Sequence, residues 1–428
     1  MNARYACGSP DHLMSRRSLL GGLTAGLGAA AAGFGNVHRA MAKELQKQNR
    51  RVLVLFLRGG VSQLESWDPK PKTATGGPFC AIPTSVPGIH ISELLPHTAK
   101  QMHRLALVRS INSRENNHGK GLYLMTRGHR QQPAVDHPHL GSLCSHLLGP
   151  ANNPLPGYIR ITPKGTGKSG SDAAFLGPKY AGVVLGDGQP PEYTTPPDGI
   201  SVESIARRDR FRQMANEQFA QRRRSAATQA YTYSFEQAAQ LMQRREVFDV
   251  TKEPQKFHDT YGTHDFGRHC LLARRLLENG VTFVQVDHTN YDTHFENFNF
   301  HIEQMGEFDK TFATLMDDLA HRGLLSSTLV VVMAEFGRTP KINQRLGRDH
   351  WGTAWSIAMG GCGIQTEAVI GKTNKTGTSV EDRQVDEGHL FHTYLQAVGV
   401  DSTEPIDVDG RPVQITNPAR SAISEVLA

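Results

Sequence analysis

Short apolar runs alternate along the chain with longer amphipathic segments. Five runs have the length and composition of buried strands: residues 51–57, 105–109, 281–287, 328–334 and 354–359. After the third run, apolar residues recur every three or four positions up to Leu319, which predicts a long helix that ends at Gly323. A strand, a helix and a second strand in this order predict a crossover between parallel strands. The pattern therefore indicates an α/β protein with a mostly parallel central sheet sandwiched by helices.

The middle of the chain departs from this alternation. Residues 150–200 are rich in glycine and proline and have few apolar runs, so we interpret them as a long loop or cap. Residues 201–245 have a basic, helical pattern, which is typical of a solvated helix face. We therefore expect one domain over residues 43–428, with a loop-rich and helical insertion at roughly residues 150–260.

The N-terminal residues have the pattern of an export signal. Ser15-Arg16-Arg17 begins a twin-arginine pattern, a weakly apolar run follows, and Ala40-Met41-Ala42 offers a cleavage site between small residues. The apolar run is too short and too glycine-rich for a stable membrane span, and no later segment reaches transmembrane length. We expect residues 1–42 to be removed after passage through the twin-arginine export machinery, which would leave a periplasmic or otherwise extracytoplasmic protein.

Composition excludes few partners beyond nucleic acid. The 428 residues carry a formal net charge of +6, but residues 43–428 hold 43 basic and 40 acidic side chains. That balance gives no support for nucleic acid as a partner. The five cysteines are scattered without the spacing of a zinc knuckle or a disulfide framework.

Acidic and histidine side chains gather just beyond two of the predicted strands. Asp292 and His294 follow the strand at 281–287, and Glu335 follows the strand at 328–334. Ligands of open α/β sheets bind outside the carboxyl ends of the strands, so these side chains should meet. Carboxylates and imidazoles together predict a divalent metal, and the histidines favour zinc, as one or two ions.

Further ligands are predicted from other loops. Glu65 follows the first strand and its Gly59-Gly60 pair, whereas Asp68 precedes a proline and is better explained as a turn residue. Among the C-terminal histidines, His350 lies in a tight loop before a strand and is the leading candidate. The alternatives, His389 and His392, share one face of a predicted helix.

A third group of residues suits an anion. His118, Lys120 and Arg127 lie around the start of a helix predicted from Leu122 onward, where the backbone dipole favours negative charge. These three residues are the catalytic candidates, since they could hold the oxygens of an ester.

Several blocks of the chain resemble a known family. The twin-arginine leader, LFLRGGVSQLESWDPKP, YDTHFEN, TLVVVMAEFGRTP and GRDHW are similar to the bacterial "domain of unknown function 1501" family, a distant relative of the alkaline phosphatase and sulfatase superfamily. The resemblance implies an alkaline phosphatase-like sheet with a two-metal site at the carboxyl ends of its strands. It places Glu65 as an acidic ligand after the first strand, His118 where the superfamily carries its nucleophile, and Glu335-Phe336 where it carries an Asp-His pair.

Two functions follow from these observations. The first is a metal-dependent hydrolase of a small anionic phosphate or sulfate ester, or of an esterified carbohydrate, in which metal-bound water attacks. Ser62, Ser110 and Ser113 are the alternative nucleophiles. The second is a non-catalytic, metal-stabilised binding protein of the cell envelope, which the departures at His118 and Phe336 favour.

Overall fold

In the part of the chain that the structure describes, the fold is built on one mixed sheet of eight strands. The computed structural model describes residues 46, 48–133, 135–150, 153, 155–163, 172–189, 199–222, 226–408 and 410–428. From edge to edge the strands are β12 (Ala368–Ile370), β4 (Leu105–Ile111), β11 (Trp355–Gly361), β8 (Thr328–Met333), β1 (Arg51–Leu57), β7 (Phe283–His288), β5 (Tyr158–Thr162) and β6 (Val183–Gly186). Strand β11 is antiparallel to β4 and β8, and the other neighbouring pairs are parallel. The predicted α/β architecture is confirmed.

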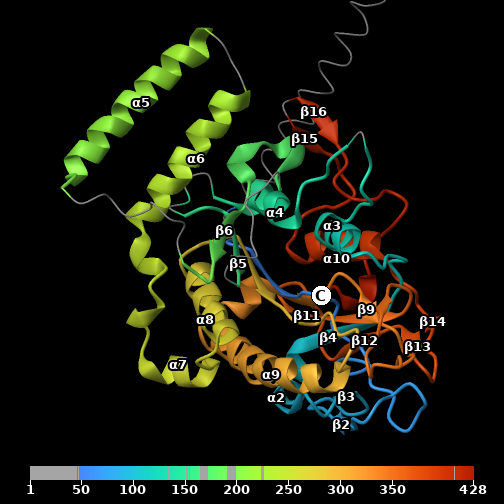
Figure 1. Ribbon diagram of the computed structural model, residues 1–428. Helices are drawn as coiled ribbons and strands as arrows, with labels where there is room; N and C mark the ends of the chain where they lie inside the picture. Colours follow the sequence, from blue (N-terminus) through green and yellow to red (C-terminus); the bar gives the residue numbers. More distant parts are fainter. Residues whose placement is uncertain are drawn as a thin grey trace, which may run out of the picture.

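Helices cover both faces of this sheet (Figure 1). On one face lie α2 (Pro96–Lys100), α8 (Asp265–Glu278) and α9 (Asn297–His321), and on the other lie α3 (His118–Arg127), α4 (Leu140–Leu148) and α10 (Glu387–Ala397). Alternate residues of β1 enter the two cores: Leu53, Leu55 and Leu57 pack in one, and Val52, Val54 and Phe56 in the other. A strand buried on both faces needs a continuous apolar run, which is why residues 51–57 lack alternation.

The remaining elements are peripheral. Helices α5 (Val202–Arg222) and α6 (Ala226–Gln243) form an arm that extends from the sheet, and α7 (Gln255–Tyr261) follows them (Figure 1). Four two-stranded sheets join β2 (Ala81–Pro83) to β3 (His90–Ser92), β9 (Gly337–Arg338) to β10 (His350–Trp351), β13 (Lys372–Thr373) to β14 (Val380–Asp382), and β15 (Ile406–Val408) to β16 (Arg411–Val413). Short 3-10 helices span Met102–Arg104, Ala174–Leu176, Pro178–Tyr180, Arg245–Val247, Val250–Lys252, Leu325–Ser327 and Ser424–Val426.

The interpretation of residues 150–200 as a loop or cap is wrong in one respect. Strands β5 and β6 come from this stretch and extend the central sheet beyond β7. They are only five and four residues long, and prolines and glycines around them masked their short apolar pattern. The boundaries of an insertion at residues 150–260 stay a prediction, and the predicted export signal at residues 1–42 lies outside the described residues.

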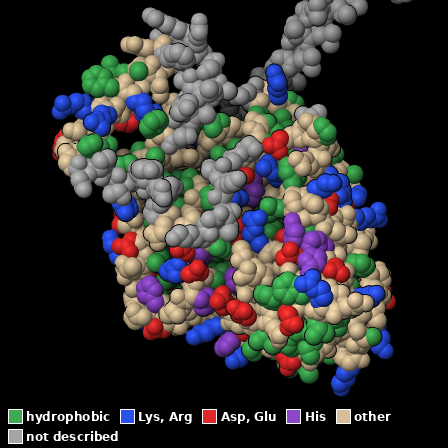
Figure 2. Space-filling model, viewed as in Figure 1, with side chains coloured by type: hydrophobic (Ala, Val, Ile, Leu, Met, Phe, Trp, Pro, Cys, Tyr) green, Lys and Arg blue, Asp and Glu red, His purple; other side chains and the backbone are tan. Residues whose placement is uncertain are grey.

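Two properties of the surface bear on partners. On the face shown in Figure 2, Lys and Arg side chains are interspersed with Asp and Glu rather than gathered in a stripe. Within the described part of the chain, no helix has the length and apolar character needed to cross a bilayer.

A pair of stacked histidines follows the C-terminal end of α3. The rings of His129 and His137 lie 3.8 Å apart at an interplanar angle of 10°. Burial, and then the neighbouring His129, lowers the pKa of His137 to about 4. Burial also lowers the pKa of His129. The folded protein therefore holds both imidazoles neutral at a pH where an unfolded chain would protonate them.

This stack predicts a pH-dependent stability. Between about pH 6.5 and pH 4 the unfolded chain binds a proton at position 137 that the folded chain does not, so the free energy of unfolding falls as the pH falls. From pH 7 to pH 5 the loss should be about 1–2 kcal/mol, since the side chain is partly exposed. Urea unfolding at pH 7 and pH 5 should show that His137→Gln loses less unfolding free energy than the unaltered protein. Equal losses in the variant and the unaltered protein would contradict the assignment of this pH dependence to His137.

Candidate metal centre

Loops from five parts of the chain meet at the edge of the sheet where the parallel strands end. Asp292 follows β7, Glu335 follows β8, and Gly59 follows β1. His118 begins α3 after β4, and His350 lies in β10, shortly before β11. Because β11 runs antiparallel to its neighbours, its start lies at the same edge as the ends of the others.

Three imidazoles converge on the carboxylate of Asp292. The Nε2 atoms of His294 and His350 lie 3.2 and 3.1 Å from Asp292 Oδ1, and Nε2 of His118 lies 3.2 Å from Oδ2. The donor atoms of His118, Asp292 and His350 all lie within 4.8 Å of one another, a grouping that could hold a metal ion. A tetrahedral zinc ion with bonds of 2.0–2.1 Å would hold its ligand atoms about 3.3 Å apart, close to these separations.

Each of these imidazoles has an acceptor on its other nitrogen. Nδ1 of His118 lies 2.7 Å from Glu335 Oε1, that of His294 lies 2.7 Å from Asp349 Oδ1, and that of His350 lies 2.7 Å from the carbonyl oxygen of Asn116. Such acceptors hold the proton on Nδ1 and leave the Nε2 lone pair for a ligand.

With protons on Nδ1, the three imidazoles present unprotonated Nε2 atoms that suit a cation. Nε2 of His294 and Nε2 of His350 lie 3.0 Å apart, and two lone pairs at this distance repel unless a cation lies between them. Nε2 of His118 and Oε2 of Glu335 are both buried, and neither makes a hydrogen bond. Burying polar atoms without partners is costly, so the orphaned atoms fit a bound ion. The residues present therefore suit a divalent metal ion that prefers nitrogen ligands.

Arg338 keeps Asp292 ionised and in place. Its Nη2 donates to Asp292 Oδ1 at 2.6 Å. Burial alone would raise the pKa of Asp292, but the hydrogen bond and charge of Arg338 outweigh it and lower the pKa to about 2. Burial lowers the pKa of His350, which favours the neutral imidazole that metals require.

Gly59 allows the loops after β1 and β7 to touch. Its φ is +108°, and a Cβ added there would lie 2.4 Å from the backbone nitrogen of Asp292. Its own N–H donates to Glu335 Oε1 at 2.9 Å. Only glycine has a side chain small enough for this positive φ and this close approach to the backbone of Asp292. Gly59 therefore lets the two loops touch, and its N–H also holds the Glu335 carboxylate in place behind His118.

The centre is open on one side. The side chains of Asp292, His118 and His294 are 48%, 39% and 38% exposed. The buried ring of Phe336 packs against His118 and His350, with centroids 4.9 and 4.5 Å away. A small ligand can therefore approach from solvent, against an apolar wall.

The structure brings five of the predicted site residues together and separates four. His118, Asp292, His294, Glu335 and His350 form the centre, with Glu335 behind His118. Glu65 is instead fully buried and paired with Arg348. His389 closes the capping box of α10 with Asp386. The runner-up, His392, is bonded through its two nitrogens to Ser402 Oγ and the carbonyl oxygen of Asn417.

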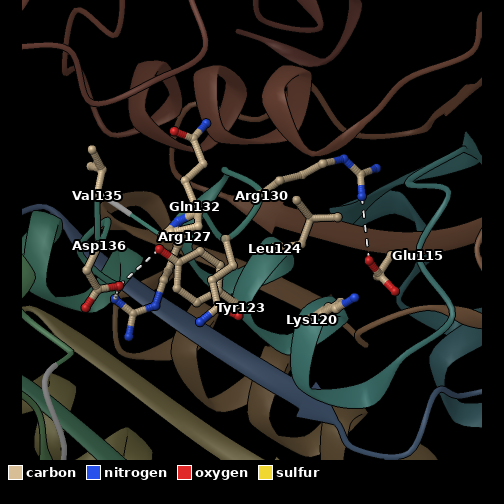
Figure 3. A pocket seen from close by; sticks show the side chains of 11 residues that line it. Glu115, Lys120, Tyr123, Leu124, Arg127, Arg130, Gln132, Val135 and Asp136 are labelled. Atoms are coloured by element: carbon tan, nitrogen blue, oxygen red, sulfur yellow. Dashed lines mark hydrogen bonds and ion pairs between the residues drawn. The ribbon is translucent and has the colours of Figure 1, made fainter.

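Lys120 and Arg127 point into a different part of the molecule. His118 and Lys120 are two positions apart on α3, which turns them about 200° from one another. Lys120 and Arg127 line a separate cavity of about 920 Å³ with Glu115, Tyr123 and Arg130 (Figure 3). There Arg127 lies over the ring of Tyr123 and 3.4 Å from Asp136 Oδ1. The structure does not place them with His118 around one oxyanion.

The three alternative serine nucleophiles are buried and engaged. Ser110 Oγ donates to the carbonyl oxygen of Arg383 at 2.6 Å, and Ser113 Oγ to that of Gly352 at 3.3 Å. Ser62 Oγ accepts from the N–H of Leu64 at 3.3 Å. All three residues are at most 1% exposed, so none offers a free hydroxyl to the centre.

Sequence reasoning missed the partners of the ligands. Arg338, Asp349 and the carbonyl of Asn116 each hold a member of the centre, and none was predicted to do so. Arg338 lies three residues after Glu335, and Asp349 directly precedes His350. A search for charged neighbours of candidate ligands would have found both residues, but not the backbone carbonyl.

The buried pair predicts different outcomes for two carboxylates. Glu65→Gln should lower the free energy of unfolding by about 3–5 kcal/mol, because it leaves Arg348 buried and unpaired, and it should leave the affinity of the centre for a divalent ion unchanged. Asp292→Asn should instead abolish divalent-ion binding, and it should also lower the free energy of unfolding because Arg338 loses its carboxylate partner. Urea unfolding and metal analysis of both variants test this, and loss of the ion in Glu65→Gln would make Glu65 part of the centre.

Comparisons with known proteins agree with the family that the sequence blocks suggest. The family described as "Protein of unknown function (DUF1501)" matches residues 49–427. No curated protein matches the chain. Solved structures with similarity include a PsFucS1 sulfatase from Pseudoalteromonas sp., at 14% identity, covering 92% of this chain and 75% of that one, with a TM-score of 0.42.

Two further matches are more distant in sequence. The lipoteichoic acid synthase LtaP from Listeria monocytogenes is 8% identical over 86% of this chain and 75% of that one, with a TM-score of 0.38. The C-terminal periplasmic domain of EcEptC from Escherichia coli, in complex with Zn, is 11% identical over 86% and 87%, with a TM-score of 0.35. Scores this low add nothing to the geometry of the centre. On the match over residues 49–427, the chain belongs to the DUF1501 family.

Proposed function

We propose that this protein is a metal-dependent hydrolase of phosphate or sulfate esters that acts in the cell envelope. The observation that carries the proposal is the convergence of three imidazole Nε2 atoms on Asp292, each imidazole being held through Nδ1 by an outer acceptor. The reaction class is supported by the resemblance of the sequence blocks to the DUF1501 family, a distant relative of the alkaline phosphatase and sulfatase superfamily.

The chain's own residues prepare the centre in three ways. Glu335, Asp349 and the Asn116 carbonyl hold protons on Nδ1, so that Nε2 of His118, His294 and His350 would face the ion. Arg338 keeps Asp292 ionised at the focus of the three rings. When bound, a divalent ion supplies Lewis acidity toward the ester and ionises water near neutral pH.

The surroundings favour hydrolysis without a covalent serine intermediate. Ser62, Ser110 and Ser113 are buried, and the hydroxyl oxygen of each takes part in a hydrogen bond away from the centre. The open side formed by Asp292, His118 and His294 gives an ester access, and Phe336 shields the opposite side from water. A non-catalytic binding protein remains the second candidate, because none of the three serine hydroxyls faces the centre as a free nucleophile.

Metal and turnover should be lost together. Asp292→Asn and His350→Ala should lose the divalent ion and lower ester hydrolysis at least a hundredfold, because each removes a donor at the focus of the centre. His389→Gln is the matched control, since that histidine caps α10, and it should keep both properties. Ser62→Ala, Ser110→Ala and Ser113→Ala should each keep most activity.

The measurements are metal analysis of the purified protein and initial rates on a panel of aryl and sugar phosphates and sulfates. A fully metallated sample without turnover on any of these esters would favour the binding protein. A covalent phospho- or sulfo-enzyme on one of the serines would contradict the route without a nucleophile.

Export by the twin-arginine route is a separate part of the proposal. Arg16→Lys with Arg17→Lys should strand the protein in the cytoplasm with its leader attached, because the arginine pair is the feature that the machinery reads. Fractionation and N-terminal sequencing should find the unaltered protein outside the cytoplasm, beginning at or near Lys43. Normal export of the double variant would refute this reading.

A further inference from the structure

Two arginine side chains next to the centre have no exposed surface. Arg338 and Arg348 are both 0% exposed, although arginine is rarely buried completely. A buried guanidinium persists only when its donors and its charge are matched. The partners of these two side chains therefore show which charges the fold has already neutralised.

Arg338 is fixed against the ligand at the focus of the centre. Its Nε donates to the carbonyl oxygen of Gly60 at 2.9 Å, and Nη1 donates to that of Arg348 at 3.0 Å. Nη2 donates to the carbonyl oxygen of Gly59 and to Asp292 Oδ1. These contacts fix the side chain of Arg338, so its positive charge stays next to the carboxylate of Asp292.

Arg348 removes the other carboxylate that a second ion would need. Its Nε lies 3.0 Å from Glu65 Oε2 and its Nη2 lies 2.8 Å from Glu65 Oε1, a two-pronged pair. The remaining donors go to the carbonyl oxygens of Thr75, Thr339 and Pro340. Glu65, which the family resemblance offers as an acidic ligand, is thus already bound to a cation of the chain itself.

The charges in and beside the centre balance with one divalent ion. Among the residues that the structure describes, four carboxylates contact the centre or its arginines: Glu65, Asp292, Glu335 and Asp349. The two arginines offset two of these charges, and one divalent cation offsets the other two. A second divalent cation would leave two positive charges in excess beside Arg338, and uncompensated charge in a partly buried site is unfavourable.

Resting on the proposed function, we infer that the centre holds one divalent cation per chain and that the guanidinium of Arg338 takes the place of a second cation. Arg338 is then a positioning residue: it holds Oδ1 of Asp292 in place so that the carboxylate faces His294 and His350, with Oδ2 toward His118. The ester would meet one metal ion and a fixed ring of imidazoles instead of a pair of metal ions.

Metal stoichiometry tests this without an activity assay. Purified apoprotein is titrated with zinc, freed of excess by dialysis, and measured by native mass spectrometry and elemental analysis. The unaltered protein should hold one zinc ion per chain. Arg338→Gln should hold more than one at zinc concentrations that leave the unaltered protein at one, because the variant has lost the competing charge. Arg338→Lys keeps the charge and should remain at one.

Three results would overturn the inference. These are two zinc ions on the unaltered protein, a single zinc ion on Arg338→Gln, or no zinc ion on the unaltered protein. If Arg338→Gln does not fold, the count on the unaltered protein still decides. Two ions with ester turnover would refute the inference and leave the hydrolase standing. One ion without turnover would refute the hydrolase and leave the inference standing.

Discussion

The guanidinium of Arg338 is the contact on which the centre depends. It joins the loop after β1, through Gly59 and Gly60, to Asp292 after β7 and to the backbone of Arg348 before β10. These segments are far apart in the chain, and none has a regular structure of its own at this point. A single planar donor group with several fixed acceptors can hold them in one geometry, because each hydrogen bond it makes has a defined direction.

The sheet makes that contact possible. Strands β1, β7 and β8 lie side by side and run in the same direction, so the residues that follow them emerge at one edge. The antiparallel strand β11 begins at this edge, His350 lies just before it in β10, and β4 leads into α3 and His118. The fold thus brings ligands from distant parts of the sequence together, and the loops need only supply the final orientation.

Much of this could be predicted from the sequence because it depends on local pattern. The apolar runs at residues 51–57 and 328–334 predicted β1 and β8 closely. The topology of parallel strands then predicted that Asp292 and Glu335 would lie at the same edge of the sheet, where each contacts one nitrogen of His118. Strands β5 and β6 were missed because four or five residues among glycines and prolines carry too little periodicity.

What could not be predicted is which charged groups pair. Glu65 and Asp292 both follow a buried strand, yet one is bound by Arg348 and the other lies at the focus of three imidazoles. Lys120 and Arg127 lie near His118 in sequence but face another cavity, since two and nine positions along a helix each turn a side chain roughly to the opposite face. Pairing is decided by the tertiary packing of loops, and no spacing rule within the sequence records it.

The most direct test of the account is X-ray absorption at the zinc edge of protein loaded with one equivalent of zinc. The geometry predicts nitrogen and oxygen neighbours at about 2.0–2.2 Å, with outer-shell scattering from three imidazoles and loss of that signal in proportion as His118, His294 and His350 are replaced. A first shell of oxygen atoms alone, without imidazole scattering, would contradict the centre described for this protein, as would sulfur ligands.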